Sequence, residues 1–188
     1  MSCAVTTKKR NITFQKVLTT SGTPERLLPY ISATTIAFTT STITDSGSKF
    51  TDKGFQPGMR IKITSSDTTS KNHNVITQIG DSATDALPGT LTLKSGFTLT
   101  TESAGSTITI VPEPNFMNVP DGVKCLVKAK FANTGTITIA DSEGKALNTK
   151  TFHMKLRNNE DYKEFVDPSV LWFDATVSGE GIEVSYGA

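Results

Sequence analysis

The chain has 188 residues and an almost balanced charge, with 19 basic and 18 acidic side chains and a formal net charge of +1. Proteins that bind nucleic acid through phosphate contacts need an excess or a stripe of basic residues, so we expect no nucleic-acid partner. The apolar runs are only a few residues long, so we also expect no membrane-spanning helix. The length allows one large β domain or two small ones.

Threonine and serine dominate the polar residues, with 31 Thr and 17 Ser, or about a quarter of the chain. Branching at the Cβ of threonine favours extended backbone, and its hydroxyl keeps the outer face of a strand soluble without charge. This composition favours β-strands that have one face in solvent.

Apolar residues alternate with polar ones along the chain, and no stretch of eleven or more residues repeats them at the helical period of 3.6. Gly-containing turn sequences separate these runs, a pattern typical of sandwiches and barrels. We therefore predict an all-β fold, with two small β-sandwich or barrel domains and an extended N-terminal arm. In chain order, the apolar positions are Met59, Ile61 and Ile63; Leu91 and Leu93; Ile108 and Ile110; Val123, Cys125, Val127, Ala129 and Phe131; Ile137 and Ile139; Phe152, Met154 and Leu156; Leu171, Phe173, Ala175 and Val177; Ile182, Val184 and Tyr186.

Clusters of breaker residues predict the domain boundaries. Residues 111–120 hold three prolines, which lack the backbone N–H that a β-ladder needs. Residues 19–30 form a second zone rich in turn formers. The predicted organisation is an extended arm at 1–12, a strand and linker at 13–30, a middle β domain at 31–111 and a C-terminal β-sandwich domain at 112–188.

Residues that commonly carry catalysis or bind metal are few and widely separated. His73 and His153 lack HxH or HExxH spacing, so we expect a structural or solvated role for each. Cys125 has no second thiol at metal-site spacing, and we expect a small buried hydrophobe in a chain made in a reducing compartment. Asp141 and Glu143 lack the DxDxDG series of a calcium loop. We therefore predict no enzyme activity, no catalytic residue, no cofactor and no metal.

Trp172 lies at the opposite parity to Leu171 and Phe173. One of these two faces has to be the core, so Trp172 either packs on a second layer or meets a partner. We favour the packed position, because large aromatic residues are mostly buried.

Two stretches resemble modules that recur in structural proteins of tailed-bacteriophage virions. Residues 42–110 follow the order of a small β module, from TITDSGS through GFQPGMRIKI, NVITQI and TLTL to TTESAGSTITI. Residues 125–147 and 166–186 resemble a phage virion sandwich and its closing hairpin, including the SGEG turn at 178–181. The match in the first module is carried by Asp45, Gly47, Phe50, Phe55, Gly58, Ile61, Asn74, Leu91, Leu93, Ala104 and Gly105.

Residues 13–29 resemble the usual opening of that virion sandwich, displaced far upstream in the chain. The resemblance suggests the hypothesis that the middle domain is inserted between the first strand of the sandwich and its remainder. Residues 13–30 would then complete the C-terminal sandwich.

The resemblance implies a capsid decoration (cement) protein, which binds the outer capsid surface and stabilises the shell by bridging subunits. Its implied partners are the major capsid protein and further copies of itself, as a homo-oligomer and often a trimer, with no nucleic acid and no membrane. The implied location is the capsid exterior of the virion, after synthesis in the host cytoplasm. The candidate capsid contact is the N-terminal arm, since a flexible segment becomes ordered when it docks. Its named residues are Ala4, Val5, Lys8, Lys9 and Arg10.

Two alternatives stay open. The first is a phage tail, head–tail connector or head-fibre component, because similar modules occur there; copy number per particle separates it from a decoration protein. The remote alternative is a carbohydrate-binding or adhesin module. Such modules usually present two or three exposed aromatic rings, whereas this chain has one Trp and three widely separated Tyr residues.

Overall fold

The computed structural model describes residues 12–47, 49–113, 125–146, 154–156, 163–165 and 171–186. In this part of the chain the strands form four antiparallel sheets of four strands each, which confirms the predicted all-β fold. The helical structure there is one short turn, α2 (Glu143–Ala146). The sheets form because apolar and polar residues alternate with period 2, so each strand presents one face to a core.

Two of the sheets enclose one hydrophobic core, and we call them the terminal sandwich. Phe14, Val127 and Ile182 enter this core from the first sheet, and Ile139 and Phe173 enter it from the second. The first sheet consists, in spatial order, of β1 (Ile12–Val17), β16 (Gly181–Tyr186), β11 (Cys125–Ala129) and β14 (Lys163–Phe165), and the second of β13 (Met154–Leu156), β12 (Ile137–Ala140), β15 (Trp172–Ala175) and β2 (Glu25–Arg26).

The other two sheets enclose a second core, and we call them the central unit. Phe50 and Phe55 pack edge to face in this core, with ring centres 5.9 Å apart, beside Ile61 and Leu91. One sheet consists, in spatial order, of β3 (Ile31–Ala33), β10 (Ile108–Pro112), β6 (Arg60–Ser65) and β7 (Val75–Gln78), and the other of β4 (Ile36–Phe38), β5 (Thr42–Asp45), β9 (Thr90–Thr92) and β8 (Ala86–Leu87).

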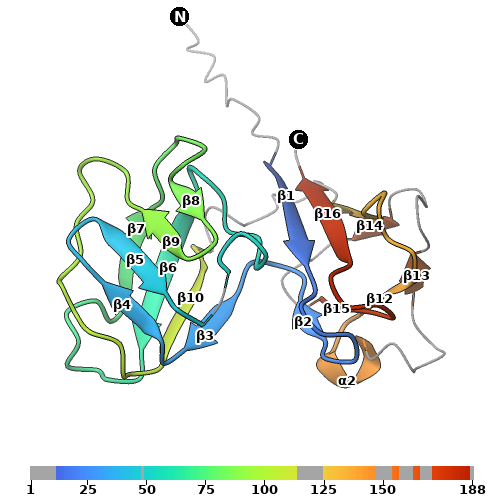
Figure 1. Cartoon of the computed structure of the whole chain (residues 1–188), viewed down its shortest axis with the longest axis horizontal. Coiled ribbons are helices and arrows are strands. Elements are labelled where there is room, and N and C mark those ends of the chain that lie inside the picture. The colour runs from blue at the N-terminus through green and yellow to red at the C-terminus, as the bar shows by residue number, and fades with distance from the viewer. Residues whose placement is uncertain are drawn as a thin grey trace, which may run out of the picture.

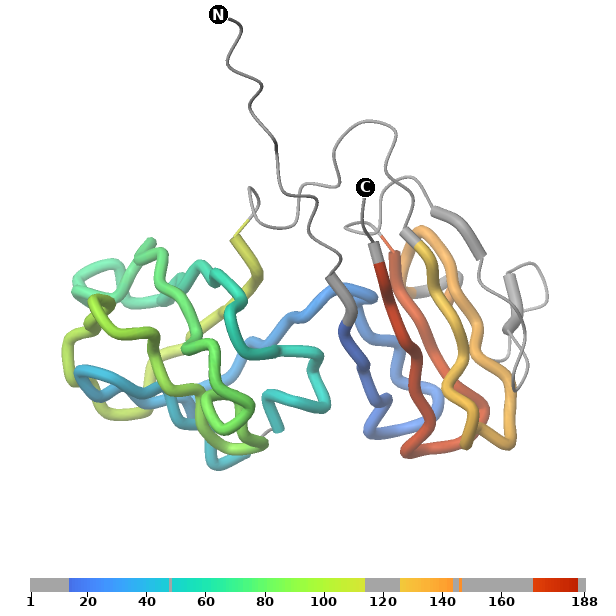
Figure 2. Tube along the Cα trace, turned by 90° about the horizontal axis from the view of Figure 1, so that it is seen from above, coloured from blue at the N-terminus to red at the C-terminus, as the bar shows by residue number. Residues whose placement is uncertain are grey.

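The N-terminal strands pair with the C-terminal ones. β1 pairs with β16 from Ile12↔Tyr186 to Val17↔Gly181, and β2 pairs with β15. Figure 1 shows β1 and β2 beside the red strands of the chain end, with the central unit at the other side, and Figure 2 shows the same arrangement from above. The insertion hypothesis requires that residues 13–30 pair with strands of the C-terminal part, as β1 and β2 do. The exact domain boundaries stay a prediction.

Most predicted core positions are buried, but two ends of the alternation were placed wrongly. Phe131, expected on the core face with Val127 and Ala129, is 76% exposed. Strand β11 ends at Ala129, and a turn follows in which the N–H of Asn133 donates to the Lys130 carbonyl. Val177 is 42% exposed for the same reason, because β15 ends at Ala175. A turn breaks the alternation of faces, so the pattern does not extend past the last paired residue.

Candidate functional site

Lys16 occupies a core-facing position in β1. Phe14 and Leu18, two residues before and after it, are buried, and Lys16 itself is only 1% exposed. Because β1 is the edge strand of its sheet, a side chain at this position points between the two sheets at an open edge of the sandwich. The long aliphatic stem of a lysine packs there while its ammonium reaches toward the opposite sheet.

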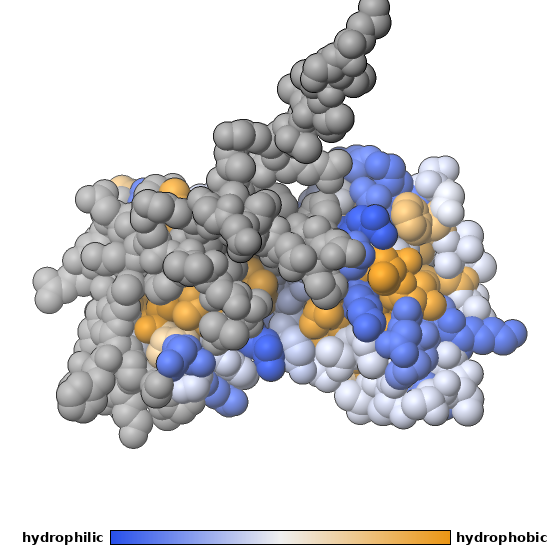
Figure 3. Space-filling model, turned by 180° about the vertical axis from the view of Figure 1, so that it is seen from behind, coloured by the Kyte–Doolittle hydropathy of each residue, from blue (hydrophilic) through white to orange (hydrophobic). Residues whose placement is uncertain are grey.

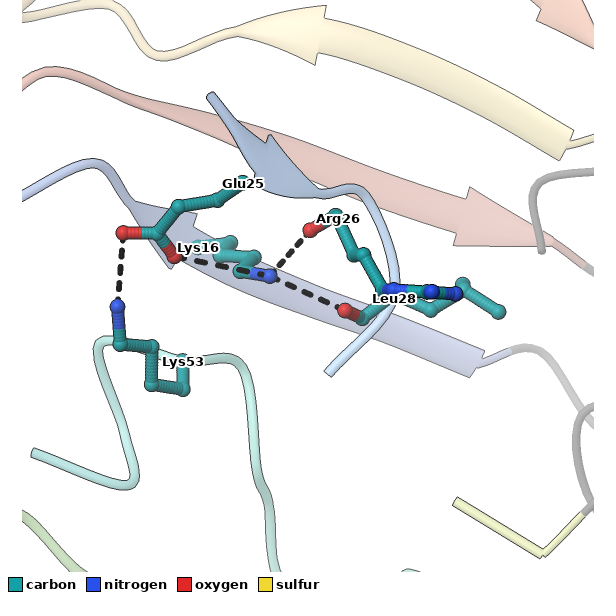
Figure 4. A network of polar contacts seen from close by, with 5 residues as sticks. All are labelled: Lys16, Glu25, Arg26, Leu28 and Lys53. Atoms are coloured by element: carbon teal, nitrogen blue, oxygen red, sulfur yellow. Dashed lines mark hydrogen bonds and ion pairs between the residues drawn. The ribbon is translucent and has the colours of Figure 1, made fainter. Parts of the chain in front are cut away.

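The ammonium of Lys16 closes this edge of the terminal sandwich (Figure 4). Its Nζ donates to the backbone carbonyl of Arg26 and, at 3.0 Å, to that of Leu28. The Oε2 atom of Glu25 lies 3.9 Å from the same Nζ. Glu25 and Arg26 form β2, which is the edge strand of the second sheet. One side chain therefore joins the edge strands of both sheets.

Burial lowers the pKa of the Lys16 ammonium from 10.5 to about 7, because the charged form loses its hydration. The carboxylate of Glu25 opposes this by raising the pKa of Lys16, whereas the positive charges of Lys53 and Arg26 lower it further. The edge of the sandwich therefore holds a group that changes its charge near neutral pH.

Glu25 also connects the terminal sandwich to the central unit. Its Oε1 atom accepts a hydrogen bond from the Nζ of Lys53 at 2.7 Å, while its Oε2 faces Lys16. Next to this ion pair, the backbone N–H of Val17 donates to the carbonyl of Asp52 at 2.9 Å. One carboxylate thus lies between an ammonium of each unit, and a backbone hydrogen bond reinforces the contact.

Gly54 allows the two units to approach closely at this junction. It has a φ of 89°, in the left-handed region that favours glycine. A Cβ atom at this position would lie 3.2 Å from the ring of Phe14 and 3.2 Å from Pro29. A larger residue would have to displace these groups, so the close contact depends on the missing side chain.

On the outer face of the second sheet, Arg26 lies between two aromatic rings. Its guanidinium carbon is 5.1 Å from the ring centre of Trp172 and 5.2 Å from that of Tyr30, within the range of cation–π attraction. Arg26 and Trp172 are directly opposite each other on β2 and β15. We predicted that Trp172 packs in the core, and this prediction is wrong. The side chain is half-buried, lies outside the hydrophobic core and packs against Arg26.

Glu25 and Lys53, which form the ion pair, line two cavities. The smaller, of about 250 Å³, is also lined by Lys16, Arg26 and Trp172, together with Pro24, Tyr30, Ile31 and Ser32. The larger, of about 410 Å³, is also lined by Thr19, Thr20, Thr23, Gly47, Lys49 and Asp52. The ion pair that connects the two units therefore borders both hollows.

The residues predicted from the sequence as a capsid contact lie outside the described residues, so their role stays a prediction. They are Ala4, Val5, Lys8, Lys9 and Arg10. His153 and the side chain of Cys125 also lie outside this part. His73 is within it, and its Nδ1 lies 2.8 Å from the carbonyl oxygen of Ser65 on β6, which is a structural position.

Sequence reasoning did not single out Lys16, Glu25 or Arg26. A signal for Lys16 was present, because it shares its strand parity with Phe14 and Leu18. Among the described residues, no group of three or more His, Cys, Asp or Glu side chains is placed to hold a metal ion. No helix in those residues is long and apolar enough to cross a membrane.

Comparisons of this chain with protein-family models, with curated proteins and with solved structures find no match.

Proposed function

We propose that this chain is a structural protein of a bacteriophage virion and acts as a capsid decoration (cement) protein. In this role it binds the outer surface of the capsid, with the major capsid protein and further copies of itself as partners. Its contribution is mechanical: each copy bridges neighbouring subunits, and many weak contacts together give firm attachment.

The junction between the two cores is the observation that supports this proposal best. The chain leaves the terminal sandwich after β2 and returns to it at β11, so two covalent connections join the units. The Glu25–Lys53 ion pair and the Val17–Asp52 hydrogen bond add two further restraints. Units of one chain generally move relative to one another unless contacts between them restrain that motion. A protein that bridges subunits under load needs the opposite, a body that does not bend.

The surface of the central unit supplies a second argument. Threonines lie opposite each other on β5 and β9, as Thr42↔Thr92 and Thr44↔Thr90, and all four are partly exposed. A face of uncharged hydroxyl groups loses less hydration energy than a charged face when another protein covers it. Large apolar side chains are exposed too, with Ile76 at 42% and Leu87 at 47%. In Figure 3, apolar residues of the central unit reach the surface between hydrophilic ones, a mixture usual in protein interfaces.

A density map of intact virions tests the proposal directly. We expect this chain in many copies over the outside of the shell, in contact with the major capsid protein. A location in the tail, the connector or a fibre, at low copy number, would contradict the decoration role and favour the alternative phage components. Absence from purified particles would contradict both.

The proposed arm contact has a separate test. Deleting residues 1–10 should weaken binding to purified capsids, because the arm would no longer reach a neighbouring subunit. Circular dichroism should stay that of a β protein, because β1 begins only at Ile12. A variant that keeps the arm but replaces Lys8, Lys9 and Arg10 by glutamine separates the effect of charge from that of reach. Unchanged capsid occupancy after the deletion would rule the arm out as the contact.

A further inference from the structure

We propose that Arg26, held between Tyr30 and Trp172, binds a carboxylate of a partner protein: an Asp or Glu side chain, in an acidic segment, that enters the adjacent cavity of about 250 Å³. That this partner is a capsid protein rests on the proposed function, whereas the carboxylate chemistry rests on the geometry alone.

The guanidinium of Arg26 has hydrogen-bond donors to offer. The side chain is exposed, and within the described part of the chain its contacts are the two rings, with no carboxylate or carbonyl bound to its N–H groups. A guanidinium carries five N–H donors in a planar fork, which matches the two oxygens of a carboxylate. A bidentate ion pair is therefore the interaction that this group is best suited to form.

The two rings prepare Arg26 for that interaction. Tyr30 and Trp172 each lie about 5 Å from the guanidinium carbon, so the group is held by two cation–π contacts before any ligand arrives. A side chain that is already ordered loses less conformational entropy on binding. Arginine, tyrosine and tryptophan are also the residue types most enriched among the energetically dominant positions of protein interfaces.

The charge and size of the cavity indicate what enters it. Among its described lining residues, Arg26 and Lys53 are positively charged, Lys16 changes its charge near neutral pH, and Glu25 is the one carboxylate. Because Glu25 is already bound to Lys53, the excess of positive charge favours an incoming anion. The volume is below the roughly 300–1,000 Å³ of typical small-molecule sites, which favours a single side chain of a larger partner.

The contact of Arg26 with both rings also favours a protein, rather than an acidic sugar, as the partner that binds at this site. Sugar-binding sites commonly use open faces of aromatic rings. Here the guanidinium of Arg26 covers one face of Tyr30 and one face of Trp172. The cluster therefore offers a partner the N–H donors of an exposed arginine.

Titration with a short polyglutamate peptide at low ionic strength tests the proposal, with the matching polyglutamine peptide as control. Trp172 is the only tryptophan of the chain, so its fluorescence reports on the stack, and calorimetry gives the affinity independently of the fluorophore. We expect saturable binding of polyglutamate that weakens about tenfold or more in Arg26→Gln, a loss of about 1.4 kcal/mol. Arg26→Lys should also weaken it, because an ammonium lacks the planar fork.

Arg60→Gln is the matched control. Arg60 is exposed on β6 in the central unit and is already ion-paired to Glu113 at 3.0 Å, so its loss should leave polyglutamate binding unchanged. The proposal is overturned if polyglutamate does not bind, or if Arg26→Gln and Arg60→Gln bind it equally well. If an oligogalacturonate bound more tightly than polyglutamate, the claim that the partner is a protein would be overturned. If inorganic phosphate displaced polyglutamate at equal concentration, the claim that the site is specific for a carboxylate would be overturned.

This experiment is independent of the proposed function. Arg26-dependent binding of polyglutamate by a chain that is absent from virions would contradict the decoration role and leave the carboxylate site standing. The reverse result, a chain on the capsid that does not bind polyglutamate, would contradict the site alone.

Discussion

Replacing Lys16 by methionine should remove a pH dependence from the stability of the terminal sandwich. The pKa of Lys16 is about 7 in the folded chain and about 10.5 when the side chain is solvated. Between these values the unfolded state binds more protons than the folded state, so the free energy of unfolding rises with pH. The stability that Lys16 contributes through this difference in proton binding is fully present above pH 10.5, and it is lost progressively as the pH falls to about 7.

The size of the effect follows from this difference in proton binding. One proton more in the unfolded state changes the free energy of unfolding by about 1.4 kcal/mol per pH unit. From about pH 7.5 to about pH 9.5, where most of a proton separates the two states, the Lys16 contribution should grow by about 2–3 kcal/mol. Methionine has a similar length and no charge, so Lys16→Met should lack this increase. It leaves the Arg26 and Leu28 carbonyls without their donor, which changes the stability at every pH alike.

Urea unfolding followed by Trp172 fluorescence is the suitable assay, because Trp172 lies in the same sandwich as Lys16. The quantity to compare is the difference in unfolding free energy between wild type and variant at each pH, since other titrating groups cancel in it. Lys62→Met is the control: Lys62 lies on β6 in the central unit and is partly exposed, so this variant should keep the slope of the wild type.

The reasoning would be refuted if the difference in unfolding free energy between wild type and Lys16→Met stayed constant across this pH range. Lys16 would then carry the same charge in the folded and the unfolded state. Glu25→Gln gives a second check. The carboxylate of Glu25 raises the pKa of Lys16, so its removal should move the rise in stability to lower pH.

Two further predictions concern packing. Phe173→Ala should cost about 3–5 kcal/mol of unfolding free energy, because Phe173 is fully buried. Phe131→Ala should change the unfolding free energy by less than about 0.5 kcal/mol, because Phe131 is mostly exposed. Equal effects of the two variants in urea unfolding would contradict the placement of both rings. Gly181→Ala should lower the stability by roughly 1–3 kcal/mol, since its Cβ would collide with the carbonyl oxygen of Lys16 on the paired strand β1; an unchanged thermal midpoint would show that the two strands are not in this register.

The strands themselves were largely predictable from the sequence. Alternating runs such as Met59, Ile61 and Ile63, or Ile137 and Ile139, are buried as the period of 2 requires. This pattern is readable because neighbouring residues of a strand point to opposite faces whatever the strand pairs with. The ends of the runs were less predictable, as Phe131 shows, because the last paired residue depends on the partner strand and the turn.

The candidate site was not predictable in the same way. Lys16, Glu25 and Lys53 come together only because β1 and β2 complete the two sheets of the terminal sandwich and a loop of the central unit packs against them. Arg26 and Trp172 meet only because β2 pairs with β15. Resemblance to a virion sandwich pointed to residues 13–29 as part of that fold, but not to these contacts.

The sequence by itself determined that the chain forms sheets and which residues of most strands face a core, since both depend on local alternation. Tertiary structure alone decided which strands become neighbours, that a lysine sits buried between two sheets, and that an arginine is stacked between two rings. The reason is physical: these contacts join segments far apart in the chain, and their energies depend on burial and charge that exist only after the sheets have packed.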